Sequence, residues 1–156
     1  MSLSEWWIDG ALARDTSGVL YATWDTQGRR EDAGWLSFSK DGGQHWSSLF
    51  RVTPDHDLAP HIMEVTGGGD GVAYVSWLSN NDTRGYAEYL RAFSVNQGFS
   101  PATRVSSQFG DPSVWPGDTT GISVLAQNQI ALSWGSATET KNQPKSQIFA
   151  TVLDFS

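Results

Sequence analysis

The sequence predicts an all-β protein built from repeated antiparallel units, and three observations lead to this prediction. Eight Trp, seven Phe and four Tyr accompany 16 Gly in 156 residues, a composition typical of short strands joined by tight turns. The same short pattern returns along the chain, and no stretch of helical length shows an apolar period of about 3.6 residues. One predicted hairpin carries a Ser, Asp, Gly and Trp pattern suited to closing a tight turn.

The repeat is visible by direct comparison of segments. Residues 18–24 (GVLYATW) return 53 residues later as residues 71–77 (GVAYVSW), and the same offset places Arg51 on Arg104. After a further 57 residues the pattern returns in residues 129–134 (QIALSW). Because several matches share one offset, the chain is divided into three units. The predicted units are 1–53, 54–106 and 107–156.

Each unit is predicted to form a meander of short strands in which Gly, Asn and Asp mark the turns. In unit one the predicted strands are residues 7–13, 19–25, 34–39 and 46–52. In unit two they are residues 61–66, 72–78, 86–93 and 99–105. Unit three has only residues 120–126, 129–135 and 146–154, so its fourth strand is missing.

The size of the unit favours one all-β architecture over another. About fifty residues with four antiparallel strands is the size of a β-propeller blade. A β-sandwich would also contain many short strands, but it need not repeat its sequence. The sequence therefore predicts a partial propeller of three blades, the last one incomplete.

The hairpin of unit one carries the pattern Ser-x-Asp-x-Gly-x-x-Trp as Ser39, Asp41, Gly43 and Trp46. Ser and Asp side chains can accept hydrogen bonds from nearby backbone N–H groups, and Gly can take the positive φ of a tight turn. Trp46 can then fold over the turn. A degenerate copy stands at residues 94–99 of unit two. These four residues are predicted to stabilise the turn and to take no part in chemistry.

This pattern resembles the Asp box of the sialidase-like β-propellers that carry bacterial neuraminidase repeats. Residues 15–24 and 111–121 resemble the same family, and the likeness is to its later blades only. The resemblance implies about six blades in a whole protein, a peripheral Asp box, and a secreted or cell-surface location. The sequence itself leaves the location open, since its start lacks the features of a signal peptide.

Three blades would leave the outer sides of the first and last blade uncovered. Residues 146–154 would also form an exposed edge of high β-propensity. The chain is therefore predicted to be a homodimer, whose two-fold axis would give a six-blade ring, or a fragment of a longer protein. Charge placed at Ile148 or Phe149 is expected to worsen its behaviour in solution.

In a propeller, the loops joining second and third strands share one face with the loops that cross to the next blade. These are the longer loops here, which favours this face for ligand binding. His61 and Asp118 stand at the same repeat position, with Trp115 near them. Polar groups mixed with an aromatic ring suit a sugar. The predicted ligand-binding residues are Arg29, Arg30, His56, His61, Asp82, Trp115 and Asp118.

The resemblance implies that a sialidase would use an arginine cluster for the substrate carboxylate, a tyrosine activated by a glutamate, and an aspartic acid. Arg29, Arg30 and Arg84 lie on the candidate face, and Tyr86 and Glu88 lie near it. No residue stands in a recognisable catalytic motif, and no Arg-Ile-Pro segment is present. No catalytic residue is assigned. The favoured hypothesis is a non-catalytic module that binds a glycan or a protein. The alternative is part of an exo-sialidase-like glycoside hydrolase, completed by a missing half or a second subunit.

Composition excludes several other partners. The net charge of −7 argues against nucleic acid, whose phosphates require Lys and Arg. The absence of Cys excludes disulfides and thiolate chemistry. No apolar run has the length of a membrane-spanning helix. Residues 55–57 together with His61 match no standard metal-ligand spacing, so neither a metal nor a cofactor is predicted.

Overall fold

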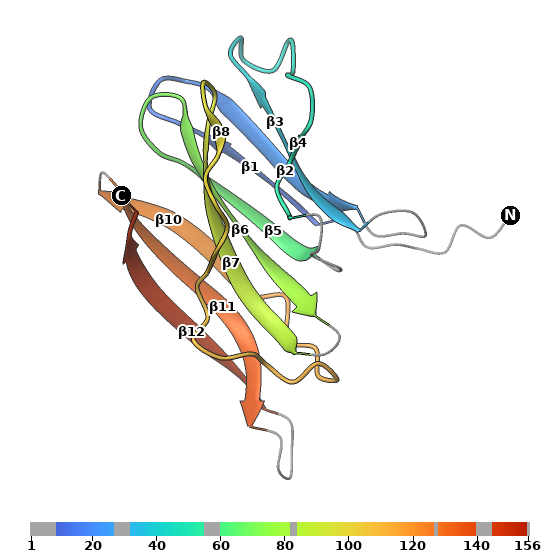
Figure 1. The fold of residues 1–156 in the computed structure, drawn as a ribbon. Helices are drawn as coiled ribbons and strands as arrows, with labels where there is room; N and C mark the ends of the chain where they lie inside the picture. The colour runs from blue at the N-terminus through green and yellow to red at the C-terminus, as the bar shows by residue number, and fades with distance from the viewer. Residues whose placement is uncertain are drawn as a thin grey trace, which may run out of the picture.

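The computed structural model describes residues 9–26, 32–54, 60–81, 84–126, 128–139 and 145–155. Within these residues the chain forms three antiparallel sheets of four, five and three strands, and no helix. The same residues accordingly contain no helix long and apolar enough to cross a membrane. The predicted all-β antiparallel fold is confirmed. The sheets follow one another in chain order, with sheet two in the middle (Figure 1).

Sheet one has four strands hydrogen-bonded in chain order: β1 (Gly10–Arg14), β2 (Leu20–Thr26), β3 (Ala33–Ser39) and β4 (Phe50–Arg51). Along β2, buried residues alternate with partly exposed ones, because successive side chains of a strand point to opposite faces. Tyr21 lies on the face toward sheet two and is fully buried. Trp24 lies on the other face and is only partly buried.

The turn between β1 and β2 ties sheet one to sheet two. The buried Asp15 carboxylate accepts hydrogen bonds from Ser17 N (2.9 Å), Ser17 Oγ (2.7 Å), Val19 N (2.9 Å) and the Tyr21 hydroxyl (2.9 Å). It also accepts one from Gly71 N at 2.8 Å, in the corresponding turn of sheet two. Burial by itself raises the pKa of Asp15, but these hydrogen bonds outweigh burial and hold the pKa below its ordinary value.

Sheet two has five strands: β5 (Pro60–Gly67), β6 (Val72–Asn81), β7 (Gly85–Ser94), β8 (Gly98–Phe99) and β9 (Thr103–Arg104). The sequence predicted a single fourth strand at 99–105. The structure instead divides that stretch into β8 and β9, which both pair with β7. Pro101 stands between them, and proline has no N–H to donate to a ladder. The prediction of four strands in this unit is therefore wrong by one.

Sheet three has three strands: β10 (Thr120–Ala126), β11 (Gln129–Glu139) and β12 (Lys145–Asp154). Three strands are what the sequence predicted for this unit. Ile148 and Phe149, the positions where added charge is expected to worsen the solution behaviour of the protein, have different surroundings. Phe149 packs against sheet two and stacks on Trp134, with ring centroids 6.0 Å apart. Ile148 points to the outer side and is 60% exposed.

Three tryptophans at the same repeat position show how the sheets are oriented. Trp77 of β6 is fully buried among residues of sheet one, and Trp134 of β11 is buried among residues of sheet two. Each of these two sheets therefore lays its tryptophan-bearing side on the sheet before it. Trp24 is the third member, and its side of sheet one is the outer side of the molecule. We call this side of each sheet its Trp face and the opposite side its far face.

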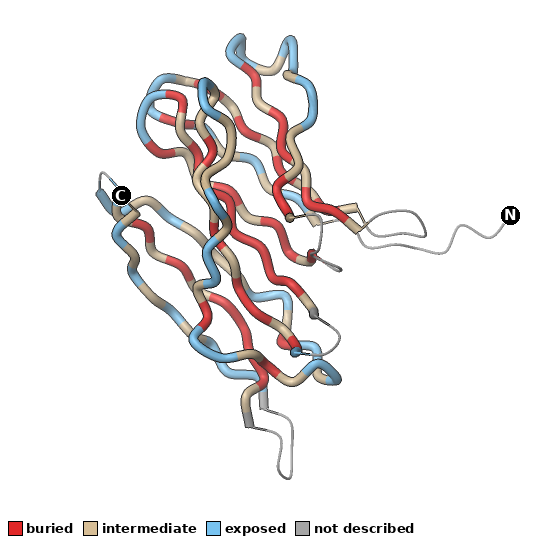
Figure 2. Tube along the Cα trace, in the orientation of Figure 1, coloured by how far each residue is buried: buried red, intermediate tan, exposed pale blue. Residues whose placement is uncertain are grey.

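Sheet two is buried on both sides, and the two outer sheets on one side each. The core between sheets one and two is built around Tyr21, Leu36, Val75, Trp77 and Phe93. The core between sheets two and three is built around Tyr74, Leu90, Ile130, Leu132 and Trp134. Figure 2 shows the result: buried residues run along the middle sheet, whereas β10 and β12 are mostly exposed or half-buried.

Candidate functional site

Three of the predicted ligand-binding residues lie together at one end of the sheets. Trp115 is central: its indole Nε1 donates a hydrogen bond to Asp118 Oδ1 at 2.8 Å. The ring of His61 lies 5.3 Å from that of Trp115, at 89° to it. The other predicted ligand-binding residues, Arg29, Arg30, His56 and Asp82, lie outside the described residues.

Tyr86 completes this group, although the sequence placed it only near the candidate face. Its ring lies 5.6 Å from Trp115, at 87°, and 6.4 Å from His61. We call His61, Tyr86, Trp115 and Asp118 the Trp115 cluster. A sequence signal for Tyr86 existed, because it opens the third strand of unit two, and the first and third strands of an antiparallel meander begin at the same end of the sheet.

A β-bulge places His61 in the cluster. The pairing of β5 with β6 shifts between His61 and Met63, so His61 pairs with Leu78 while Met63 pairs with Trp77. Without the extra residue, His61 would share the side of Met63 and point toward sheet one. The residue that makes the bulge is Ile62, with φ of 48°. A positive φ is strained for a β-branched residue, and such strain concentrates at functional sites.

The connection from sheet two to sheet three holds Trp115 in place through its backbone. Gly110 N donates to Tyr86 O and Asp111 N donates to Ala137 O, both at 2.8 Å. The chain runs so close to β11 that a Cβ at Gly135 would stand 2.4 Å from Pro116 O. Trp115 is thus presented by a segment fastened to both sheets, which limits the entropy lost when a ligand orders it.

Chemically, the Trp115 cluster offers an exposed aromatic ring beside polar groups. Trp115 is 42% exposed, and the flat face of an indole packs well against the C–H groups of a sugar ring. The Asp118 carboxylate can accept hydrogen bonds from hydroxyl groups next to that ring. This combination of one apolar surface and a few directed polar groups is typical of small polar ligand sites.

Glu88 lies two residues beyond Tyr86 but inside the core between sheets two and three. It is fully buried, and within the described part of the chain neither carboxyl oxygen has a hydrogen-bond partner. The pKa of Glu88 is raised to about 8, mainly by burial; the Ser76 hydroxyl opposes this rise, and the charge of nearby Glu64 adds to it by less than Ser76 takes away. A side chain with no exposed surface cannot contact a ligand at the Trp115 cluster.

The Asp box lies at the opposite end of the strands, in the hairpin between β3 and β4 (Figure 1). Ser39 Oγ accepts hydrogen bonds from Gly43 N (2.9 Å) and Asp41 N (3.4 Å) and donates one to Asp41 Oδ1 (2.8 Å). Asp41 also accepts from His45 N at 2.9 Å. Gly43 has φ of 91°. These bonds are the turn chemistry that the motif predicts, while Trp46 stays 44% exposed.

Replacing Asp41 by alanine is expected to lower the midpoint of thermal unfolding by a few degrees, because the turn loses its side-chain acceptor. The affinity of the Trp115 cluster for any ligand should not change. Differential scanning calorimetry and calorimetric titration of the same variant test both parts. Full thermal stability combined with loss of binding would show that Asp41 has a functional role instead.

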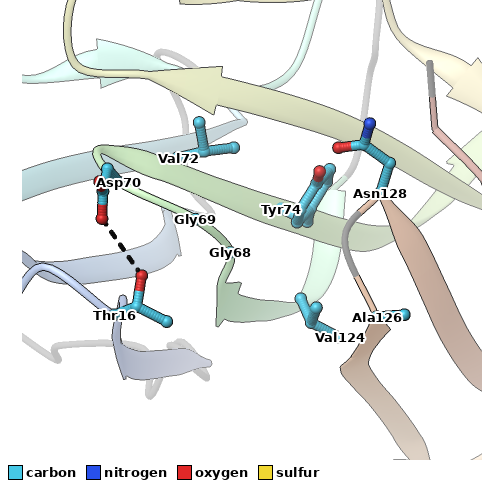
Figure 3. A pocket seen from close by; sticks show the side chains of 9 residues that line it. All are labelled: Thr16, Gly68, Gly69, Asp70, Val72, Tyr74, Val124, Ala126 and Asn128. Atoms are coloured by element: carbon cyan, nitrogen blue, oxygen red, sulfur yellow. Dashed lines mark hydrogen bonds between the residues drawn. The ribbon is translucent and has the colours of Figure 1, made fainter.

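A hollow of about 640 Å³ lies at the Asp-box end, between the first turns of sheets two and three (Figure 3). Thr16 Oγ1 donates to Asp70 Oδ1 at 3.3 Å beside it, and Tyr74 forms part of its wall. Gly68 stands 53 residues after Asp15, at the same repeat position. Between sheets one and two that position carries the bridging carboxylate, whereas Gly68 has no side chain. The absence of a side chain at Gly68 therefore accounts for the hollow.

No protein-family model matches the chain, and no curated protein matches it. Within the described residues, no group of three His, Cys, Asp or Glu side chains could hold a metal ion.

Proposed function

We propose that the chain is a non-catalytic glycan-binding module built of sialidase-like propeller blades, with the Trp115 cluster as its binding site. The observation that carries the proposal is the exposed Trp115 ring, fixed by Asp118 and flanked by His61 and Tyr86. A fixed aromatic surface costs little conformational entropy on binding.

Two features support the blade architecture. A β-sandwich has two packed sheets, whereas here three sheets follow one another, each laying its Trp face on the one before. The hairpin of sheet one also has the Asp-box pattern together with its turn hydrogen bonds. Repeated sheets packed in one orientation are the arrangement of blades in a propeller.

A glycan fits the cluster better than a protein partner. The exposed surface centres on one indole ring with polar groups at its edge, whereas a protein interface of standard size buries about 800 Å² on each partner. The exo-sialidase-like alternative would require a tyrosine activated by a glutamate, with an acidic aspartate and arginines beside the sugar. In the described residues, Asp118 is the carboxylate bonded within the cluster, and Glu88 is buried away from it.

Replacing Trp115 by alanine is expected to weaken glycan binding at least about tenfold, the equivalent of about 1.4 kcal/mol. A printed glycan array identifies the bound sugar, and isothermal titration calorimetry with that sugar measures the affinity. Trp46→Ala is the matched control, because Trp46 has nearly the same exposed fraction but lies in the Asp-box hairpin. Binding should survive in this control.

Asp118→Ala should also weaken binding, because the indole loses its hydrogen-bond acceptor and the sugar loses a partner. Unchanged affinity in both Trp115→Ala and Asp118→Ala would place the site elsewhere. An array without any bound glycan would contradict the proposed function itself.

A further inference from the structure

Two apolar sheet faces of this molecule have no neighbour among the described residues. One is the Trp face of sheet one, which carries Leu12, Trp24 and Trp35, with the Arg51 guanidinium lying over the Trp35 ring. The other is the far face of sheet three, which carries Ile148 and Val152, both more than half exposed. Each lies at one end of the stack of sheets (Figure 1).

The two internal interfaces show what covers each kind of face. The Trp face of sheet two packs on the far face of sheet one, and the Trp face of sheet three packs on the far face of sheet two. The same pairing therefore occurs twice within the chain. The two faces left over are one Trp face and one far face, and a second copy of the chain offers one face of each kind.

The far face of sheet three has the small, uncharged residues of a face that receives a tryptophan ring. In sheet one, which receives Trp77 and its neighbours, the far face has the small residues Ala11 and Thr23. The repeat places Gly121 and Ser133 at the same positions of sheet three. These two residues line a shallow depression whose lining, drawn from β10, β11 and β12, contains no charged residue. A depression of this kind can accept an indole ring from another sheet.

The Trp face of sheet one carries a pair of aromatic residues like the pair that sheet two packs on its neighbour. Trp24 and Trp35 are paired across β2 and β3, as Trp77 and Tyr89 are paired in sheet two, where the rings stack at 5.5 Å. Trp77 is fully buried by its neighbouring sheet. Trp24 is only partly buried, and burial of aromatic surface is the main driving force of such association.

We propose that two copies of this chain associate as a closed pair, in which the Trp face of sheet one packs on the far face of sheet three of the other copy, twice. A two-fold axis makes both contacts equivalent and leaves neither face free, so growth stops at two copies. The pair rests on the blade architecture proposed above, but it does not depend on a ligand at the Trp115 cluster.

The mass in solution is the first test. Size-exclusion chromatography with light scattering should give twice the chain mass. Hydroxyl-radical footprinting of the same wild-type samples should show Leu12 and Val152 becoming protected together as the concentration rises. A stable monomer at high concentration would overturn the proposal, and so would open filaments.

Single variants test each face separately. Leu12→Asp and Val152→Asp should each shift the protein to monomer. Trp46→Asp is the control, because Trp46 is 44% exposed and lies in the Asp-box hairpin, outside the strands that form the two faces. Circular dichroism of each variant shows whether it is folded. If a variant is unfolded, the wild-type footprinting decides.

Mixing the two variants tests which faces meet. In a mixed pair, one contact joins two unaltered faces and the other joins the two altered ones, so equimolar Leu12→Asp and Val152→Asp chains should form a dimer that neither forms alone. A dimer insensitive to Val152→Asp would instead pair two copies of sheet one and would overturn the proposal. Glycan titration of the monomeric variants reports separately on the Trp115 cluster.

Discussion

Replacing Asp15 by alanine is expected to destabilise the protein by about 3 kcal/mol or more. The variant would leave the buried Val19 and Gly71 backbone N–H groups and the buried Tyr21 hydroxyl without their acceptor. The partly exposed Ser17 N–H would lose it too. Buried donors without partners cost free energy individually. Because Gly71 belongs to sheet two, the loss also loosens the contact between sheets one and two. Urea denaturation at pH 7 measures the free energy of unfolding.

Asp70→Ala is the matched control, since Asp70 is exposed in the corresponding turn of sheet two. It should change the free energy of unfolding far less. The pH dependence adds a second readout. The pKa of Asp15 is lowered in the folded state, so its contribution is complete above the ordinary pKa of 3.8 and is lost as the pH falls below it. A wild-type protein no more acid-sensitive than Asp15→Ala would contradict this account.

Replacing Glu88 by methionine is expected to stabilise the protein at pH 8 by an amount on the order of 3–5 kcal/mol. The carboxyl is fully buried without a hydrogen-bond partner among the described residues, and its folded-state pKa is about 8 against an ordinary value of 4.5. The folded protein therefore retains a proton that the unfolded chain releases between these two values. Stability falls as the pH rises through this window, and methionine removes that loss while filling a similar volume.

The gain from Glu88→Met should shrink as the pH is lowered from 8 to 5. At lower pH the wild-type carboxyl is increasingly protonated in the unfolded chain as well as in the folded protein, so the two states differ less in bound protons. Urea denaturation at several pH values measures the difference. Asp70→Asn controls for the removal of one negative charge from a chain of net charge −7. A gain that is equal at all pH values would show that the pKa of Glu88 is not raised.

Much of the secondary structure followed from local sequence. Residues 72–78 were expected as a strand and lie in β6, and residues 129–135 lie in β11. The repeat carried this information, because the same alternation of apolar residues and the same turn glycines return in each unit. The fourth strand of unit two was less predictable. Pro101 divides it into β8 and β9. Whether a proline ends a strand or only interrupts its pairing depends on the strand beside it.

The sequence by itself determined the three units, most of their strands and the Asp-box turn, because each depends on residues close together in the chain. Only the tertiary structure decided which side chains meet. The bulge at Ile62 turns His61 toward Tyr86 and Trp115, and a one-residue shift in strand pairing leaves no mark in composition or period. The bridge from Asp15 to Gly71 and the burial of Glu88 likewise arise from packing between sheets. Contacts of this kind depend on how whole sheets are stacked, which local sequence does not encode.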